Sequence, residues 1–276
     1  MITFADQKVL FDYDASLSFA INEIGVEVRD GVTVKDITFT AVRGGNPVSA
    51  YLVAPDRAES CAAILWVHWL GEEHSNRNQY LDEAVELAKL GVVSLLPNAM
   101  WSQENWYRNR VPAEDYANGI RQVIELRRAM DLLLSQPHVD AQRVAFVGHD
   151  YGGMYGTLAA GVDNKAKAYV FIAVAPSFFD WAFYATQPES RTEYICQNAI
   201  LEPTDYLRQI KNAAFLFQYA QTDPYVGYMK RVEFVRSAPE PREMRVYEDA
   251  EHSMNTTQIR ADRTTWLKVQ LSLVST

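Results

Sequence analysis

The sequence predicts an α/β fold in which a mostly parallel central sheet is covered by helices on both faces. Short apolar runs alternate with stretches of helical periodicity along most of the 276 residues, and this order of elements is typical of a parallel sheet. Several runs are apolar at every position, as expected for strands buried on both faces. One run leads through a glycine-rich turn directly into a helical stretch of small residues, at 143–161.

The strands can be predicted in chain order. Two segments, 32–42 and 48–54, flank the turn sequence Gly-Gly-Asn-Pro at 44–47, so we expect them to pair as a hairpin. Apolar runs then predict strands at 62–69, 92–96, 144–147, 168–175, 213–219 and 243–247.

Helices are predicted between the strands from apolar residues that recur at helical spacing. The predicted helices cover 78–90, 115–134, the stretch after the turn at 148–153, and 262–273. The segment 177–209 is longer than a simple crossover and rich in aromatic residues, so we expect a short lid over the carboxyl edge of the sheet. Packed core helices would have the same composition. No repeat or linker divides the chain, and we expect a single domain over 1–276.

The composition and net charge of the chain limit the kinds of partner that it is expected to bind. The chain is 48% hydrophobic with a net charge of −9, which argues against nucleic acid or an anionic membrane as partner, since both attract basic patches. Two distant cysteines, Cys61 and Cys196, are expected to be reduced thiols. The sequence has neither a secretory leader nor an apolar run of about 18 residues, so we expect a cytoplasmic enzyme.

The sequence GHDYGG, residues 148–153, has the pattern of a nucleophile elbow with Asp150 at its centre. Gly148 and Gly152 stand two places either side of Asp150, where a side chain would block the close approach of strand and helix. An aspartate before a helix can also be a simple helix cap. A cap, however, requires neither the flanking glycines nor the buried strand before it.

On these residues the chain resembles the α/β-hydrolase superfamily, from about residue 32 to the end. The order of elements matches: Asp150 in the elbow, Asp223 in YAQTDPY after one strand, and His252 in EDAEHSM after the next. The resemblance implies a catalytic triad of these three residues. Turn formation alone would explain Asp223, which precedes a proline, and His252 would otherwise be an ordinary surface histidine.

The resemblance also implies an oxyanion hole made of two backbone N–H groups. One belongs to the residue after the nucleophile, Tyr151, at a helix N-terminus whose dipole favours negative charge. The other belongs to the loop that begins at His68, where Leu70 is the candidate donor. Many relatives have glycine directly after that histidine, whereas this chain has Trp69.

A carboxylate at the elbow favours one kind of chemistry. It is suited to in-line attack on saturated carbon that carries a halide or an epoxide oxygen, which gives an alkyl-enzyme ester. His252, oriented by Asp223, would then activate water to hydrolyse the ester. The elbow resembles that of epoxide hydrolases and haloalkane dehalogenases, while the hairpin, loop, short lid and length resemble dienelactone hydrolases, which act on esters and lactones.

Aromatic residues predict the character of the pocket. Trp69, Trp101, Trp106 and Tyr184 are the candidate substrate-binding residues, and they suggest a small apolar organic substrate that reacts with water. We expect no cofactor and no metal, because the acidic and histidine residues at 68–74 lack the HExxH spacing and no phosphate-binding or dinucleotide motif occurs. Glu72 and Glu73 are candidates for the pocket mouth. Dimers are common on this scaffold, but no segment of the sequence singles out an interface.

The leading hypothesis is therefore a cofactor-free hydrolase that works through an alkyl-enzyme ester on Asp150. A second hypothesis is an ester or lactone hydrolase in which Asp150 is a general base for water. A third is a non-catalytic member of the fold that binds a small apolar ligand.

Overall fold

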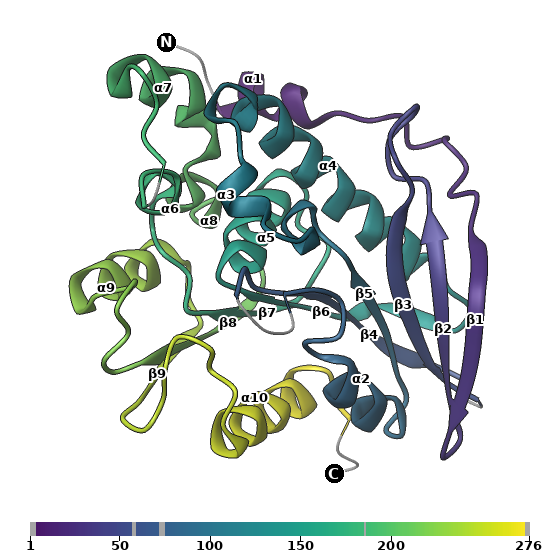
Figure 1. Cartoon of the computed structure of the whole chain (residues 1–276). Helices are drawn as coiled ribbons and strands as arrows, with labels where there is room; N and C mark the ends of the chain where they lie inside the picture. The colour runs from purple at the N-terminus through teal and green to yellow at the C-terminus, as the bar shows by residue number, and fades with distance from the viewer. Residues whose placement is uncertain (1–3, 57–58, 72–74, 185, 274–276) are drawn as a thin grey trace.

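The computed structural model describes residues 4–56, 59–71, 75–184 and 186–273. Its described strands form one nine-stranded sheet with the order β1-β2-β3-β5-β4-β6-β7-β8-β9 (Figure 1). The strands are β1 Asn22–Arg29, β2 Val32–Phe39, β3 Val48–Pro55, β4 Cys61–Val67, β5 Val92–Pro97, β6 Val139–His149, β7 Ala168–Ile172, β8 Ala214–Ala220 and β9 Arg242–Tyr247. The strands from β1 to β3 pair antiparallel, as does β3 with β5, and all pairs from β5 to β9 are parallel.

Helices cover both faces of the sheet, as predicted. They are α1 Phe4–Lys8, α2 Leu81–Ala88, α3 Trp106–Asn109, α4 Asp115–Leu134, α5 Tyr151–Val162, α6 Phe178–Ala182, α7 Arg191–Asn198, α8 Pro203–Leu207, α9 Tyr228–Ser237 and α10 Thr257–Gln270. Short 3-10 turns lie at Val9–Phe11, Met100–Ser102, Pro112–Glu114 and Ala199–Leu201. In Figure 1, α4 and α5 lie on one side of the sheet and α2 and α10 on the other.

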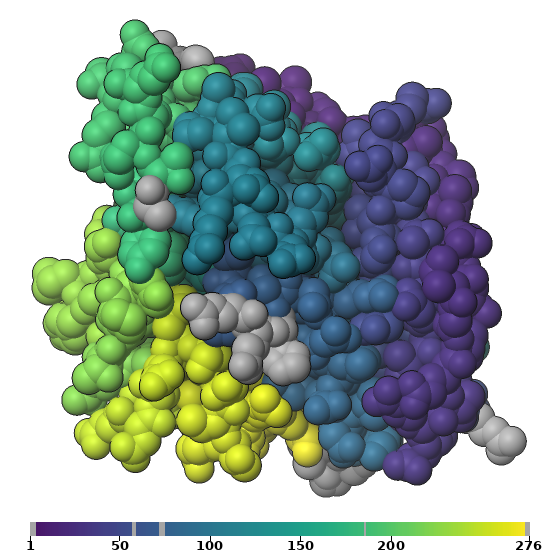
Figure 2. Space-filling view, viewed as in Figure 1, coloured from purple at the N-terminus to yellow at the C-terminus, as the bar shows by residue number. Residues whose placement is uncertain are grey.

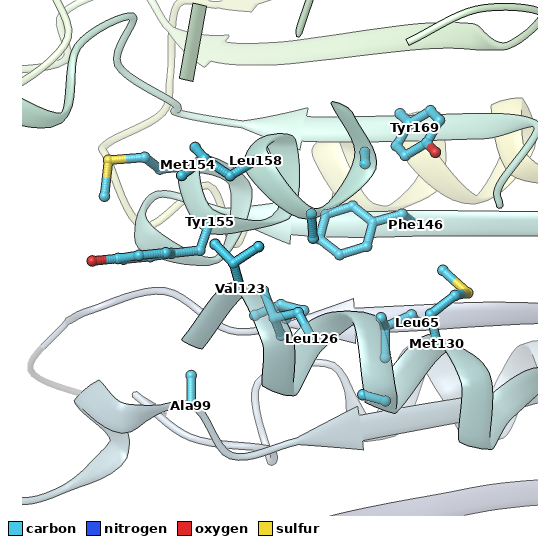
Figure 3. Close-up of a cluster of buried hydrophobic side chains, with 14 of the residues drawn as sticks. Leu65, Ala99, Val123, Leu126, Met130, Phe146, Met154, Tyr155, Leu158 and Tyr169 are labelled. Carbon is cyan, nitrogen blue, oxygen red and sulfur yellow. The ribbon is translucent and has the colours of Figure 1, made fainter. Parts of the chain in front are cut away.

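The apolar runs bury both faces because side chains alternate along a strand. In β4, Ala63 and Leu65 belong to the core under α4 and α5, whereas Ile64 and Trp66 belong to the core under α2 and α10. Figure 3 shows the first of these cores, where side chains of α4 and α5 meet those of the central strands. This packing fixes the positions of the loops at the carboxyl edge of the sheet.

Element boundaries match the predictions with a few differences. The helix predicted over 115–134 is α4, whereas the last helix starts at Thr257, not 262, because the Thr256 hydroxyl caps it by accepting from the Ile259 amide. Strand β1 and helix α9 were not predicted. The segment 177–209 contains α6, α7 and α8, and α8 packs on α5. Among the helices in the described ranges, none combines the length and apolar composition that a bilayer crossing requires.

Candidate active site

The turn between β6 and α5 holds Asp150 in a backbone conformation that few non-glycine residues adopt. Its φ is 52° and its ψ is −116°. A Cβ on Gly152 would lie 2.4 Å from the carbonyl oxygen of Val67, and a Cβ on Gly148 would lie 2.7 Å from the carbonyl oxygen of Gly152. The two glycines therefore allow β4, β6 and α5 to meet closely. Positive φ at a functional side chain in such a tight turn is the geometry of a nucleophile elbow.

Asp150, Asp223 and His252 lie together at the carboxyl edge of the sheet. Nδ1 of His252 is 2.8 Å from Oδ2 of Asp223, and Nε2 of His252 is 3.9 Å from Oδ1 of Asp150. The other oxygen of Asp223 accepts from the amides of Tyr225 and Val226, at 2.8 and 3.0 Å. Asp223 is thus fixed by its own turn and in turn orients the His252 ring toward Asp150.

The two carboxyl oxygens of Asp150 differ. Oδ2 accepts from the Leu70 amide at 3.1 Å, and the Tyr151 amide also interacts favourably with the ionised carboxylate. Oδ1 is buried, and no hydrogen-bond partner reaches it among the residues that the structure describes. Both predicted oxyanion-hole amides therefore face the carboxyl group of Asp150 itself, while its second oxygen is left free beside His252.

The charges of these residues are coupled. Burial raises the pKa of Asp150 above the usual range for a carboxyl group, although His252 and the two amides act in the opposite direction. Burial alone would lower the pKa of His252, but the carboxylates of Asp150 and Asp223 outweigh it and raise that pKa to about 9. Burial also acts against the charge of Asp223, yet the contacts with His252, Tyr225 and Val226 lower its pKa. The pKa of His252, raised to about 9, favours the protonated ring between the two aspartates at neutral pH.

His149 connects the parts of this site. Its Nε2 is 2.9 Å from the carbonyl oxygen of His252, and its Nδ1 is 2.8 Å from Nε2 of Gln79, whose Oε1 accepts from the Trp69 amide. Burial lowers the pKa of His149 well below its usual value, so the ring is neutral. Because Gln79 donates to Nδ1, the proton of His149 is on Nε2 and is donated to His252. One neutral histidine thus links the elbow, the loop of His252 and the loop of Leu70.

His68 holds the same loop through its two ring nitrogens. Its Nε2 accepts from the Ala99 amide at 3.0 Å, and its Nδ1 lies 2.8 Å from the carbonyl oxygen of Trp69. Burial lowers the pKa of His68 to about 4, so the neutral ring carries its proton on Nδ1 and donates it to Trp69. The backbone of Trp69 is therefore held at its amide by Gln79 and at its carbonyl by His68. This is the loop that presents the Leu70 amide.

The four predicted aromatic residues lie at different depths. Trp69 stacks on His149, with ring centroids 5.0 Å apart, and its centroid is 6.1 Å from that of His252. Trp106 packs edge-on against Tyr151, at 5.7 Å. Trp101 is fully buried behind Tyr151 and donates its indole N–H to the His68 carbonyl. Tyr184 is 61% exposed and packs edge-on against Tyr225, with ring centroids 5.4 Å apart.

Two aromatic residues close to His252 were not among the predicted site residues. The Tyr225 ring centroid lies 4.8 Å from that of His252, and the Trp181 centroid 5.6 Å from it. Trp181 comes from α6, in the predicted lid, and its indole N–H is buried with no hydrogen-bond partner among the described residues. The position of Tyr225, two residues after Asp223, is a sequence signal that could have identified it.

In the described ranges, no three His, Cys, Asp or Glu side chains lie together so that they could hold a metal ion. Both ring nitrogens of His68 are already engaged in the contacts given above. Glu72 and Glu73, predicted near the pocket mouth, and His74 lie outside the described residues.

Known proteins share this architecture. The model of the prolyl oligopeptidase family matches residues 78–271. An acetyl xylan esterase from Paenibacillus sp. has a TM-score of 0.76 at 18% identity, covering 96% of this chain and 92% of that chain. An acetyl xylan esterase from Thermoanaerobacterium sp. has a TM-score of 0.75 at 15% identity, over 98% and 92% of the two chains. A Klebsiella pneumoniae protein described as a dienelactone hydrolase has a TM-score of 0.60 at 18% identity, over 83% and 94%.

No curated protein matches the sequence. At these identities the structural neighbours establish the fold alone. The family match spans more than two thirds of the chain and includes the elbow as well as the loops of Asp223 and His252. The chain is a hydrolase of the α/β-hydrolase fold and belongs to the prolyl oligopeptidase family.

Proposed function

We propose that the protein is a cofactor-free hydrolase that opens a small apolar epoxide or halogenated substrate through a covalent ester on Asp150. The observation that carries this proposal is the asymmetry of the Asp150 carboxyl group. Its Oδ2 faces the amide of Leu70, while its buried Oδ1 has no partner among the described residues. An oxygen without a hydrogen bond in a buried site is the better nucleophile, since nothing needs to be removed from it before attack.

The first step is displacement at saturated carbon. Oδ1 of Asp150 forms a bond to the carbon, and the bond from that carbon to the halide or epoxide oxygen breaks, with the electron pair leaving on that atom. An epoxide oxygen takes up a proton as it leaves. Tyr225, whose ring centroid is 4.8 Å from that of His252, is the candidate proton donor to the epoxide oxygen. The indole N–H of Trp181, whose ring centroid is 5.6 Å from that of His252, can donate a hydrogen bond to a departing halide but keeps its proton.

The second step is hydrolysis of the ester. Ester formation removes the negative charge of Asp150, which is one of the two charges that raise the pKa of His252. His252 then releases its proton to bulk water more readily, and the neutral ring can accept a proton from the attacking water. The hydroxide attacks Cγ of Asp150, and the oxyanion develops on Oδ2, where the amides of Leu70 and Tyr151 stabilise it. Collapse of this intermediate breaks the bond between Cγ and the ester oxygen, and the proton that His252 took from water passes to that oxygen, which leaves as the alcohol.

Isotope transfer tests this mechanism directly. A single turnover in ¹⁸O-labelled water should place one ¹⁸O atom in the Asp150 side chain, because the water oxygen attacks Cγ of Asp150. Mass spectrometry of the peptide that contains Asp150 measures the label. Turnover of a true substrate with an unlabelled Asp150 would exclude the covalent ester.

Two variants make the test sharper. His252→Gln should stop the reaction after the first step, so that the Asp150 peptide gains the mass of the alkyl group of the substrate. Asp150→Asn should abolish turnover, by a factor of about 10³ or more if the nucleophile is lost. Asp205→Asn is the matched control, since the side chain of Asp205 is 61% exposed and forms an exposed ion pair with Arg208, three residues further on. A panel of epoxides, haloalkanes and activated esters identifies the substrate class.

The second candidate function is ester or lactone hydrolysis with Asp150 as a general base for water. It is favoured by the structural neighbours, two of which bear the name acetyl xylan esterase. Its weakness is that the Leu70 amide is engaged by Asp150 and would have to be released to a substrate carbonyl. This function predicts turnover of activated esters without ¹⁸O in Asp150 and without a mass increase in the His252→Gln variant.

A further inference from the structure

Helix α6 forms part of the cover over the active site. It carries Trp181, whose ring centroid is 5.6 Å from that of His252, and Asp150 is only 1% exposed. A substrate therefore reaches Asp150 only when part of this cover moves. With five residues, α6 is too short to be stable alone, so its position depends on the contacts that hold it.

The first turn of α6 rests on the carboxyl group of Glu202. The Ser177 hydroxyl accepts from the Phe179 amide and donates to Oε1 of Glu202 at 3.0 Å. The Phe178 amide also interacts favourably with the ionised carboxylate. Glu202 directly precedes α8, which packs on α5, and Figure 1 shows α6 and α8 side by side. This carboxyl group thus links α6 to the core of the molecule.

Glu202 is half-buried and has no cation of its own. Asp180 of α6 pairs with Lys230 at 2.8 Å, and Asp205 of α8 pairs with Arg208 at 3.4 Å, but within the described ranges no basic side chain forms such a pair with Glu202. Burial is the main cause that raises the pKa of Glu202, to about 7, and repulsion by Asp205 and Asp180 acts in the same direction.

A hollow of about 360 Å³ gives water access to this carboxyl group. Charged side chains from the surrounding helices share its lining with Glu202: Asp180 of α6, Asp205 of α8, Arg208 directly after α8, and Lys230 and Glu233 of α9. Figure 2 shows the green segment that contains α6 and α7 at the molecular surface. Glu202 can therefore exchange its proton with solvent while α6 is in place.

We propose that Glu202 is a pH-responsive release for α6. Ionisation of its carboxyl group places a half-buried charge between α6 and α8, and Asp180 of α6 repels this charge, so α6 loosens and uncovers His252. Protonation removes the charge and restores the cover. The proposal concerns access to the site, so it is independent of whether Asp150 acts as a nucleophile or as a general base.

Closed α6 binds the proton of Glu202 more tightly than open α6 does. An exposed glutamate has a pKa of about 4.3, whereas the closed structure raises the pKa of Glu202 to about 7. The stabilisation of the closed form is therefore fully present below about pH 4.3 and is lost as the pH rises through 7. Between pH 6 and 8 the ratio of closed to open α6 should fall about ten-fold.

Hydrogen exchange of the full chain measures this change. The amides of Phe179, Phe183 and Tyr184 donate hydrogen bonds within α6 and at its two ends. After correction for the intrinsic exchange rate, the protection of these amides should fall about ten-fold from pH 6 to pH 8. Amides of the buried helix α5 provide the internal reference and should keep their protection.

Two variants assign the effect to one carboxyl group. Glu202→Gln carries no charge and keeps an acceptor for the Ser177 hydroxyl, so the protection of α6 should stay high at both pH values. Glu125→Gln is the matched control, because burial also raises the pKa of Glu125, in α4, to about 7. A wild type whose α6 protection is independent of pH, a dependence that survives Glu202→Gln, or a dependence that Glu125→Gln removes would overturn the proposal.

Thiol labelling at a single pH tests access. Ala182 of α6 is fully buried, and a Cys196→Ser background leaves only the buried Cys61 as a native thiol. At pH 8 the thiol of Ala182→Cys should react with DTNB about ten-fold more slowly when Glu202→Gln is added. Equal labelling rates would contradict a release of α6 by Glu202. Thermal unfolding of each variant verifies that the fold is intact.

Discussion

At the scale of single residues, His252 is the group whose charge depends most on its surroundings. It lies between Asp150 and Asp223 and is buried, and its pKa is raised to about 9. An unfolded histidine has a pKa of about 6.5. The folded state therefore binds the proton more tightly, and this preference stabilises the fold below about pH 6.5 and is lost as the pH rises through 9.

The resulting prediction concerns stability against pH. Between pH 6.5 and 9 the free energy of unfolding should fall by about 1 to 3 kcal/mol, measured by urea denaturation at several pH values. His252→Gln should remove this slope, whereas His138→Gln, a change at an exposed histidine, should retain it. Asp150→Asn should reduce the slope, because it removes one of the two carboxylates. A wild-type stability that is flat over this range would contradict the charged His252.

The residues that hold the site in place were harder to predict than those that make it up. The three residues Asp150, Asp223 and His252 each follow a strand, in the order of the superfamily. Their positions can therefore be predicted from the sequence. The link from His149 through Gln79 to Trp69 has no such pattern, since His149 and Gln79 are 70 positions apart. It arises only when the carboxyl ends of β4 and β6 meet at the same edge of the sheet.

At the scale of elements, the close meeting of β4, β6 and α5 is the strictest requirement of the fold. Gly152 is in the first turn of α5, and a Cβ there would lie 2.4 Å from the Val67 carbonyl oxygen and 2.5 Å from that of His68. Both atoms belong to the backbone and cannot rotate away. Relief would require α5 to move away from β4, where the loop that presents the Leu70 amide to Asp150 begins.

We therefore expect Gly152→Ala to destabilise the protein by about 3 kcal/mol, the upper part of the range for overpacked sites. Gly227→Ala is the matched control. A Cβ at Gly227 meets nothing within 4 Å, and its φ of −65° suits any residue, so its effect should stay within about 0.5 kcal/mol. Equal stability of the two variants in thermal and urea unfolding would show that the elbow tolerates a side chain.

Elements that bury both faces were predictable, and an exposed strand was not. β4 and β5 are apolar at nearly every position and were predicted to within two residues. β1 has no buried face, so the alternation of Ile24, Val26 and Val28 with polar residues and glycine does not mark a side of the core, as it would in a half-buried strand. A signal was nevertheless present: Asp30 and Gly31, both with positive φ, form the tight turn that joins β1 to β2.

At the scale of the whole molecule, a buried ion pair joins helix α2 to α10, the last helix of the chain. Arg263 of α10 donates from Nη2 to Oε1 of Glu83 at 2.6 Å and from Nε to Oε2 at 3.0 Å, across 180 residues of sequence. The two side chains are 2% and 10% exposed, and Gln218 of β8 accepts a further hydrogen bond from Arg263. The pair lies beside the apolar core that α2 and α10 share, so it fixes the two helices relative to each other.

Replacing one partner of this ion pair should lower the free energy of unfolding more than replacing both partners. Arg263→Met leaves the Glu83 carboxylate buried without its partner, and the free energy of unfolding should fall by about 3 to 5 kcal/mol. In the double variant with Glu83→Gln no charge remains, so much of that loss should be recovered. Arg208→Met, which breaks the exposed pair with Asp205, should cost less than about 1 kcal/mol. Urea denaturation of the four proteins measures these differences, and a double variant as unstable as Arg263→Met would mean that packing of the arginine side chain, not its charge, holds α2 and α10 together.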